Sequence, residues 1–169
     1  NSEIDGAVKF LPQKLYDGLS DIYSFAFYEN EVWMGARLTG LQSWTPTSAL
    51  FPETDGDAWN TYYPPVQGWV YDMEFDDDGN LIMATSEGLM IHFRESDNLY
   101  IYNAFEKKKR WTPDWTEEGQ WVLEAEYAAD EARLGNGECS EIADVEIDAQ
   151  GNVWLATYGG GISLLTEED

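Results

Sequence analysis

Residues 143–157 of this 169-residue chain read ADVEIDAQGNVWLAT, and residues 71–85 read YDMEFDDDGNLIMAT. The same pattern therefore occurs twice, 72 residues apart and without a gap. On either side of the Asp-x-x-Gly-Asn turn, apolar side chains alternate, as Val145 and Ile147 do. Alternation with a period of two is typical of a half-buried strand, and glycine provides the positive φ of a tight hairpin. Each copy thus predicts two antiparallel strands joined by a short turn.

A weaker third copy lies nearer the start of the chain, where residues 22–27 and 31–35 repeat the pattern with a shorter turn at 29–30. A glycine and another apolar stretch follow every copy, at Gly40, Gly88 and Gly160. The chain thus predicts three meanders of three strands, and the variable segments after the first two should each add a fourth, outer strand. The repeat blocks span about residues 20–46, 69–94 and 141–166.

The stretch DAQGNVWLATYGGGI at residues 148–162 resembles the blade repeat of the two-component-regulator propellers, which occur in periplasmic sensor regions of hybrid histidine kinases and in secreted proteins. Residues 76–89 match it with Ile82 in place of Trp154, and the first copy keeps Trp33 but lacks the Asp-x-x-Gly-Asn turn. The resemblance implies an all-β fold, a β-propeller of four-stranded antiparallel blades with about three blades per chain. It also implies an extracellular or periplasmic location. A single-domain sandwich is the alternative fold.

The predicted array covers residues 1–169 as one propeller segment, with a variable insertion at 95–139. Its two ends are complementary, because residues 7–11 predict an outer strand without inner strands before it, and residues 162–165 predict a third strand without a fourth. Three blades are fewer than the roughly four to eight that close a ring. Two interpretations follow: a homodimer closing a six-bladed ring, or a piece of a larger propeller.

The charge of the chain excludes some partners. With 33 acidic and 9 basic residues the net charge is −24, so binding to nucleic acid by phosphate neutralisation is excluded and an anionic membrane surface is disfavoured. No window reaches the roughly 18 apolar residues of a membrane span. The excess of acid also suits a saline environment, where screening reduces the self-repulsion of the chain.

One segment resembles the beginning of a calcium loop. Glu74, Asp76 and Asp78 alternate and are followed by Gly79, as in loops whose oxygens converge on a hard cation. Thr85 stands where such a loop would carry its bidentate Glu. The favoured interpretation is a hairpin turn in which Asp accepts backbone hydrogen bonds, with calcium as the weaker alternative and no cofactor expected.

The aromatic residues supply the candidate ligand-binding groups. Trp33 and Trp154 occupy equivalent repeat positions and are expected in the core between blades. Other aromatic residues lie in or beside the variable segments, where an exposed indole offers a flat apolar face and a hydrogen-bond donor on a rigid scaffold. These candidates are Trp44, Trp59, Trp69, Tyr62, Tyr63, Trp111, Trp115 and Trp121.

The remaining chemistry-bearing residues are few. His92 is the single histidine and is expected to be structural, and the lone Cys139 excludes an intrachain disulfide. The segment EKKKR at 106–110 is either a solvated strand end or a site for an acidic ligand. Residues 114–134 predict either a helix or, as the favoured reading, a strand at 121–127 followed by a helical turn.

Binding is the favoured function class. Asp148 stands three residues before Gly151, whereas the sialidase Asp-box has a spacing of two, and no glycine loop leads into a helix as a phosphate site would. We expect a non-catalytic module for a protein or other ligand, acting in a homo-oligomer or as part of a larger propeller. A lectin-like glycan-binding oligomer is the alternative, and a glycan-active enzyme with carboxylates in a central channel is the further alternative.

Overall fold

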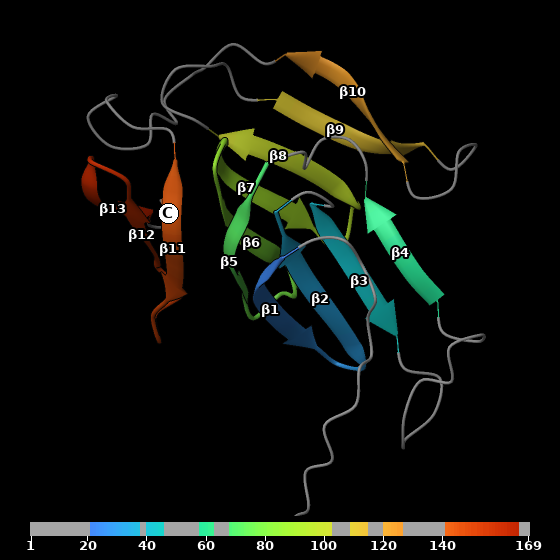
Figure 1. Ribbon diagram of the computed structural model, residues 1–169, viewed down its shortest axis with the longest axis horizontal. Helices are drawn as coiled ribbons and strands as arrows, with labels where there is room; N and C mark the ends of the chain where they lie inside the picture. Colours follow the sequence, from blue (N-terminus) through green and yellow to red (C-terminus); the bar gives the residue numbers. More distant parts are fainter. Residues whose placement is uncertain are drawn as a thin grey trace, which may run out of the picture.

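Thirteen β-strands make up the part of the chain that the computed structural model describes (Figure 1). The described residues are 21–37, 40–45, 58–62, 68–102, 109–114, 120–126 and 141–165. Among them there is no helix long and apolar enough to cross a membrane. The described chain is thus all-β, as the sequence predicts, and its strands form three antiparallel sheets.

The first sheet is a meander of four strands in sequence order. Its turn at 29–30 is tight because Glu29 adopts a φ of 50°, and Gly40 has a φ of 64° just before the third strand. The sheet confirms the weak first repeat and its predicted outer strand. Its strands are β1 (Ile22–Tyr28), β2 (Glu31–Ala36), β3 (Leu41–Thr45) and β4 (Ala58–Tyr62).

The second sheet has six strands rather than the predicted four, in the order β10-β9-β8-β7-β6-β5. Two strands from the insertion extend it, because β9 pairs with the outer edge of β8 through Leu99 opposite Trp111. The last strand confirms the predicted outer strand and corrects the helical alternative there; the expected helical turn lies outside the described residues. The strands are β5 (Val70–Phe75), β6 (Leu81–Thr85), β7 (Gly88–Phe93), β8 (Asn98–Tyr102), β9 (Lys109–Asp114) and β10 (Gln120–Glu126).

The third sheet has three described strands, β11 (Ile142–Ile147), β12 (Val153–Thr157) and β13 (Gly161–Leu165). This confirms the predicted meander of three strands in this repeat. The outer strand expected at residues 7–11 lies outside the described residues.

The Asp-x-x-Gly-Asn stretches form hairpin turns, as predicted. Asp76 Oδ1 accepts hydrogen bonds from the backbone N–H of Asp78 at 3.0 Å and of Asn80 at 2.7 Å. Asp148 makes the equivalent bonds in the third sheet. Gly79 and Gly151 have φ values of 79° and 82°, a region that other residues adopt only with strain.

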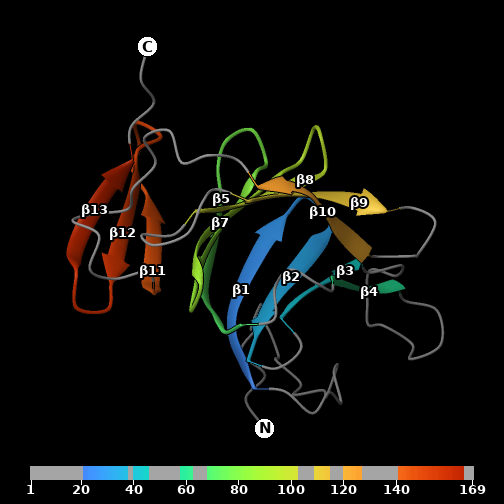
Figure 2. The same cartoon turned by 90° about the horizontal axis from the view of Figure 1, so that it is seen from above.

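The three sheets stack face to face in sequence order (Figure 2), with β1 against β5 and β11 against β5 and β6. β6 lies between the other two sheets, and all five of its residues are buried. Its side chains alternate, so Leu81 and Met83 pack toward the first sheet while Ile82 and Ala84 pack toward the third. A strand buried on both faces requires apolar side chains at successive positions, and residues 81–84 of β6 provide them.

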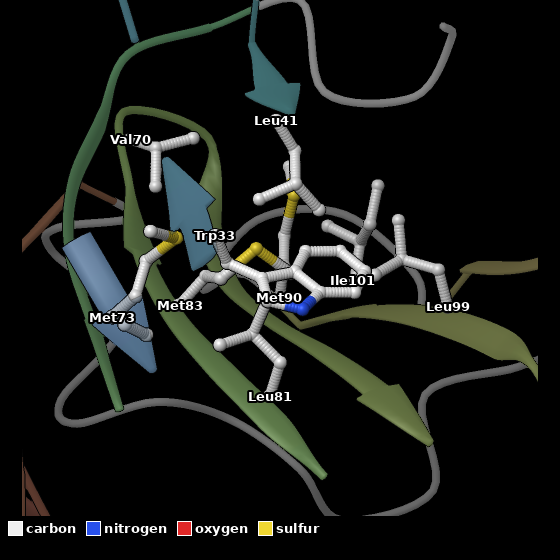
Figure 3. Packing of buried hydrophobic residues seen from close by; sticks show 10 residues of the cluster. Trp33, Leu41, Val70, Met73, Leu81, Met83, Met90, Leu99 and Ile101 are labelled. Carbon is white, nitrogen blue, oxygen red and sulfur yellow. The ribbon is translucent and has the colours of Figure 1, made fainter. Parts of the chain in front are cut away.

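The core between the first two sheets surrounds Trp33 (Figure 3). The strands approach closely at Gly35, where a Cβ atom would lie 2.3 Å from Ser24 Oγ and 2.6 Å from Val70 Cγ1. The other members of this cluster are Ala26, Leu41, Val70, Met73, Leu81, Met83, Met90, Leu99 and Ile101.

The two repeat tryptophans have different surroundings. Trp33 is 4% exposed, which confirms its prediction as core between sheets. Trp154 is 42% exposed, so the same prediction is wrong for it within the described chain. The physical reason is that Trp154 faces away from the second sheet, on the far side of the last described sheet, where no further described sheet packs against it.

Substitution of Gly35 tests the close approach of the first two sheets. Alanine occupies the equivalent strand positions 84 and 156, so the strand itself accepts a methyl group. We expect Gly35→Ala to reduce the free energy of unfolding by about 1–3 kcal/mol, because the methyl group has to push Ser24 and Val70 apart. Urea unfolding of the two proteins measures this, and an unchanged midpoint would contradict the packing described.

Candidate functional site

The inner strands β1, β5 and β11 begin at the same end of the stack, which we call the rim. Each start is tied to the end of the neighbouring strand by an equivalent backbone hydrogen bond. The N–H of Arg37 donates to the carbonyl of Asp21 at 3.0 Å, and that of Ser86 donates to Trp69 at 3.0 Å. The third bond of this kind runs from the N–H of Tyr158 to the carbonyl of Glu141 at 3.1 Å.

A β-bulge follows each of these bonds. The strand register shifts between Ile22 and Ser24, between Val70 and Asp72, and between Ile142 and Asp144. The bulged residues are therefore Tyr23, Tyr71 and Ala143. Because a bulge re-aims a side chain, two of the three repeats present a tyrosine at the rim.

These tyrosines belong to a cluster of four aromatic side chains and one arginine from all three sheets, which we call the rim cluster: Tyr23, Arg37, Trp69, Tyr71 and Tyr158. The rings of Tyr23 and Trp69 stack with centroids 5.7 Å apart and planes 12° apart. Tyr71 lies 5.7 Å from the ring of Trp69 and 5.7 Å from that of Tyr158. The guanidinium of Arg37 lies 4.6 Å from the centroid of the Trp69 ring.

Solvent reaches the two ends of the rim cluster. Tyr23 is 45% exposed and Tyr158 is 54% exposed, while Trp69 and Tyr71 between them are half-buried. The hydroxyl of Tyr71 donates a hydrogen bond to the carboxylate of Glu141. Burial and this carboxylate raise the pKa of Tyr71, so the phenol stays protonated and holds β5 to the start of β11. The rim cluster is thus a rigid centre with two accessible tyrosine faces.

The predicted aromatic candidates are only in part brought together. Trp69 joins the rim cluster. Trp44 does not stand in a loop, because it pairs with Val32 and Trp59 within the first sheet, in β3, and it is 8% exposed. Four candidates lie in strands whose side chains are outside the described part, namely Trp59 and Tyr62 in β4, Trp111 in β9 and Trp121 in β10. Tyr63 and Trp115 lie outside the described residues, as do Glu106 to Lys108 of the basic segment.

Sequence reasoning missed Tyr23, Tyr71, Tyr158 and Arg37. One signal was present, because Tyr23 and Tyr71 occupy the same position of two repeats, directly before Ser24 and Asp72. Alternation alone places such a residue on a sheet face. The bulge that turns it to the rim depends on pairing with the next strand, which the sequence pattern does not show.

The calcium candidates lie at the opposite end of the inner strands, beside a groove of about 590 Å³ between the two hairpin turns. Two of the three carboxylates already have partners: Asp76 bonds within its turn, and Glu74 Oε2 accepts a hydrogen bond from the N–H of Ile147 at 2.6 Å. Among the described residues, no group of three or more acidic, His or Cys side chains is placed to hold a metal ion. Calcium binding by Glu74, Asp76 and Asp78 stays a prediction without a geometric argument.

Carboxylates also line up along β5 and β11. Asp72 Oδ2 accepts a hydrogen bond from the N–H of Val145 at 3.2 Å, next to the bond of Glu74. The pKa of Asp144 is raised, first by partial loss of hydration although the side chain keeps solvent contact, then by the charge of Asp72 and a hydrogen bond with it, and by Glu146. Partial burial likewise raises the pKa of Glu74.

His92 takes a structural position in β7. It is 6% exposed, its Nε2 lies 2.6 Å from Asp97 Oδ1, and its ring lies 5.6 Å from that of Trp33. This contact ties the turn after β7 to the core between the first two sheets.

Comparison with known proteins identifies no family: no family model and no curated protein matches the chain. Three solved structures of low sequence identity can be aligned with most of this chain. The computationally designed Ika4 protein is 14% identical with a TM-score of 0.41, over 92% of this chain and 98% of Ika4. The WD40 beta propeller domain of Doa1 is 8% identical with a TM-score of 0.26, over 92% of this chain and 95% of that domain.

The third structure is the extracellular domain of a protein from B. thetaiotaomicron assigned to the hybrid two-component systems. It is 14% identical with a TM-score of 0.38, over 90% of this chain. The chain spans 28% of the length of that domain. At such identities and scores these likenesses carry no argument about function.

The pair Asp144 and Asp72 predicts a pH effect on stability. Because the pKa of Asp144 is raised in the folded state, the folded chain binds a proton more readily than the unfolded chain, and this group favours folding increasingly as the pH falls from neutral toward about 4. Asp144→Asn should therefore raise the melting temperature at pH 7 and flatten its dependence on pH.

Thermal unfolding followed by circular dichroism between pH 7 and pH 4 measures this effect. Asp77→Asn removes the same charge from an exposed turn position and serves as the matched control. Equal melting temperatures of the two variants at pH 7 would contradict the destabilising effect of the Asp144 charge in the folded chain.

Proposed function

We propose that this chain is a segment of a β-propeller that acts as a non-catalytic binding module, with a protein or peptide as its ligand at the rim cluster. The rim cluster carries the proposal, because it gathers Tyr23, Trp69, Tyr71, Tyr158 and Arg37 from three sheets into one rigid patch. Tyr, Trp and Arg are the residues that dominate binding energy in protein interfaces. Rigid aromatic side chains also lose little conformational entropy when a ligand docks.

The surrounding charge favours a basic ligand. The chain carries a net charge of −24, and Asp21 lies beside Arg37 at the rim, with its Oδ2 atom 3.9 Å from Nη1. Glu141 lies next to Tyr71 at the start of β11. A peptide segment that presents an apolar side chain to the tyrosines and Lys or Arg to these carboxylates matches both the aromatic rings and the negative charge of the rim. Its association is expected to weaken at high salt.

Glycan binding is the second candidate function, since an exposed tyrosine ring such as Tyr158 can stack on a sugar. The indole that would serve best, Trp69, already contacts the stacked ring of Tyr23 and the guanidinium of Arg37. A glycan-active enzyme has less support, because Asp72 and Glu74 hold backbone N–H groups of β11. We therefore rank glycan binding and glycan-active catalysis below protein binding.

We further propose that the module acts in an extracellular or periplasmic setting and that two copies join into a six-bladed ring. The repeats of residues 71–85 and 143–157 support the propeller, and the face-to-face stacking of the sheets supports continuation of the array.

Selection from a displayed library of random peptides, compared with a glycan array, tests the proposed ligand class. We expect enrichment of peptides that carry aromatic and basic residues. We expect Tyr158→Ala to weaken their binding at least about tenfold, as removal of an interface hot spot does. The exposed position of Tyr158 lets the variant fold.

Tyr100→Ala is the matched control, because Tyr100 lies on β8, three strands away from β5 in the same sheet. Equal loss of binding in both variants would contradict the rim cluster as the site. Binding to glycans without peptide enrichment would favour the lectin-like function.

A further inference from the structure

Two sheet faces of the described chain expose large apolar side chains. On the last sheet Trp154, Ile162 and Leu164 are 42%, 76% and 46% exposed. On the first sheet Phe25 and Phe27 of β1 are 55% and 72% exposed. Farther along this face Met34 and Trp44 are buried, so its open part lies along β1. Apolar groups gathered on one face mark an interaction surface more often than scattered ones do.

The strand registers show what covers the equivalent positions in the middle sheet. Trp154 lies opposite Glu146 as Ile82 lies opposite Glu74, and Ile162 lies opposite Ala156 as Leu89 lies opposite Ala84. Ile82 and Leu89 are 4% and 1% exposed because the third sheet packs on them. The open face of the last sheet thus has the pattern of a face that receives another sheet.

The open strand on the first sheet matches in the same way. Phe25 lies opposite Met34 as Val145 lies opposite Leu155, and Phe27 lies opposite Val32 as Ile147 lies opposite Val153. In β11 the backbone N–H groups of Val145 and Ile147 point away from β12 and donate to Asp72 and Glu74. The shared register gives the N–H groups of Phe25 and Phe27 the same direction at the edge of β1.

The two carboxylates that accept these N–H groups occur in β5 and again in β11, but not in β1. Asp144 and Glu146 of β11 are the equivalents of Asp72 and Glu74, and both are exposed. The equivalent positions of β1 carry Ser24 and Ala26, which pack directly against the second sheet. A strand can thus stack without these carboxylates, yet β11 of the last described sheet keeps both and leaves them exposed.

We propose that the open face of the last sheet docks on the open β1 face of a second copy of this chain. Glu146 and Asp144 then accept hydrogen bonds from the backbone N–H groups of Phe27 and Phe25 in the second copy. Ile162, Leu164 and Trp154 cover the phenylalanine rings, and the contact repeats the one between β5 and β11.

This inference deepens the ring proposed above by assigning its two faces and their hydrogen bonds, and it is independent of the ligand at the rim cluster. The contact is head to tail, so each copy uses both faces. Three described sheets from each of two copies make six, which lies within the roughly four to eight that close a propeller ring. Closure then leaves neither face exposed.

Salt should strengthen the assembly. Two chains of net charge −24 repel each other, and screening reduces this repulsion without affecting apolar contacts. The peptide proposed for the rim cluster has the opposite salt dependence, so the two interactions can be told apart.

Sedimentation velocity of the full chain without ligand, at low and high salt and across a concentration series, tests the assembly. We expect a species of twice 19.2 kDa whose share rises with salt. Ile162→Asp on the last sheet and Phe27→Asp on the first should each weaken dimerisation at least about tenfold, because a buried unpaired charge opposes docking. Glu146→Ala should weaken it more than Glu146→Gln, which keeps an acceptor oxygen.

Ser96→Asp is the matched control, since it adds the same charge at an exposed turn of the second sheet that belongs to neither face. Circular dichroism melts show whether each variant is folded. A monomer at all concentrations and salts would overturn both the ring and its faces. A dimer that Ile162→Asp and Phe27→Asp weaken no more than Ser96→Asp does would keep the ring and overturn the assigned faces.

Discussion

Stacking of one β-sheet on the next is the interaction on which the rest of this structure depends. A meander of three or four strands has two faces and cannot bury both of them alone. Here the middle sheet is covered on both sides, and β6 is buried at every position as a result. Side chains as different as Trp33 and Val145 are core because another sheet lies on them. Removal of either neighbour would expose a full apolar face.

The contact between β5 and β11 combines apolar packing with hydrogen bonds from carboxylates to backbone amides. Asp72 and Glu74 take the N–H groups that an inner strand leaves unpaired at its edge. Buried backbone donors of this kind need partners. Partial burial first, and then the neighbouring Asp72, raise the pKa of Asp144 at this contact. A bulge near the start of β1 and of β5 turns Tyr23 and Tyr71 toward the rim.

Most of the strand plan follows from the sequence. Alternating apolar residues and the Asp-x-x-Gly-Asn turns predict β5, β6, β11 and β12, and the turn bonds of Asp76 and Asp148 agree with that reading. The six-stranded width of the second sheet does not follow, because β9 and β10 pair at long range with an edge that no local pattern marks. The candidate site was predicted only at Trp69. Its other members depend on bulges and on the approach of separate sheets.

The sequence by itself determined the all-β class, the repeat spacing, the hairpin turns and the acidic charge, because each depends on residues close together in the chain. Only the tertiary structure decided which faces are covered. Trp33 and Trp154 occupy the same repeat position, yet one is 4% and the other 42% exposed. Burial is a property of the neighbouring sheet, and a strand carries no local record of whether such a neighbour is present.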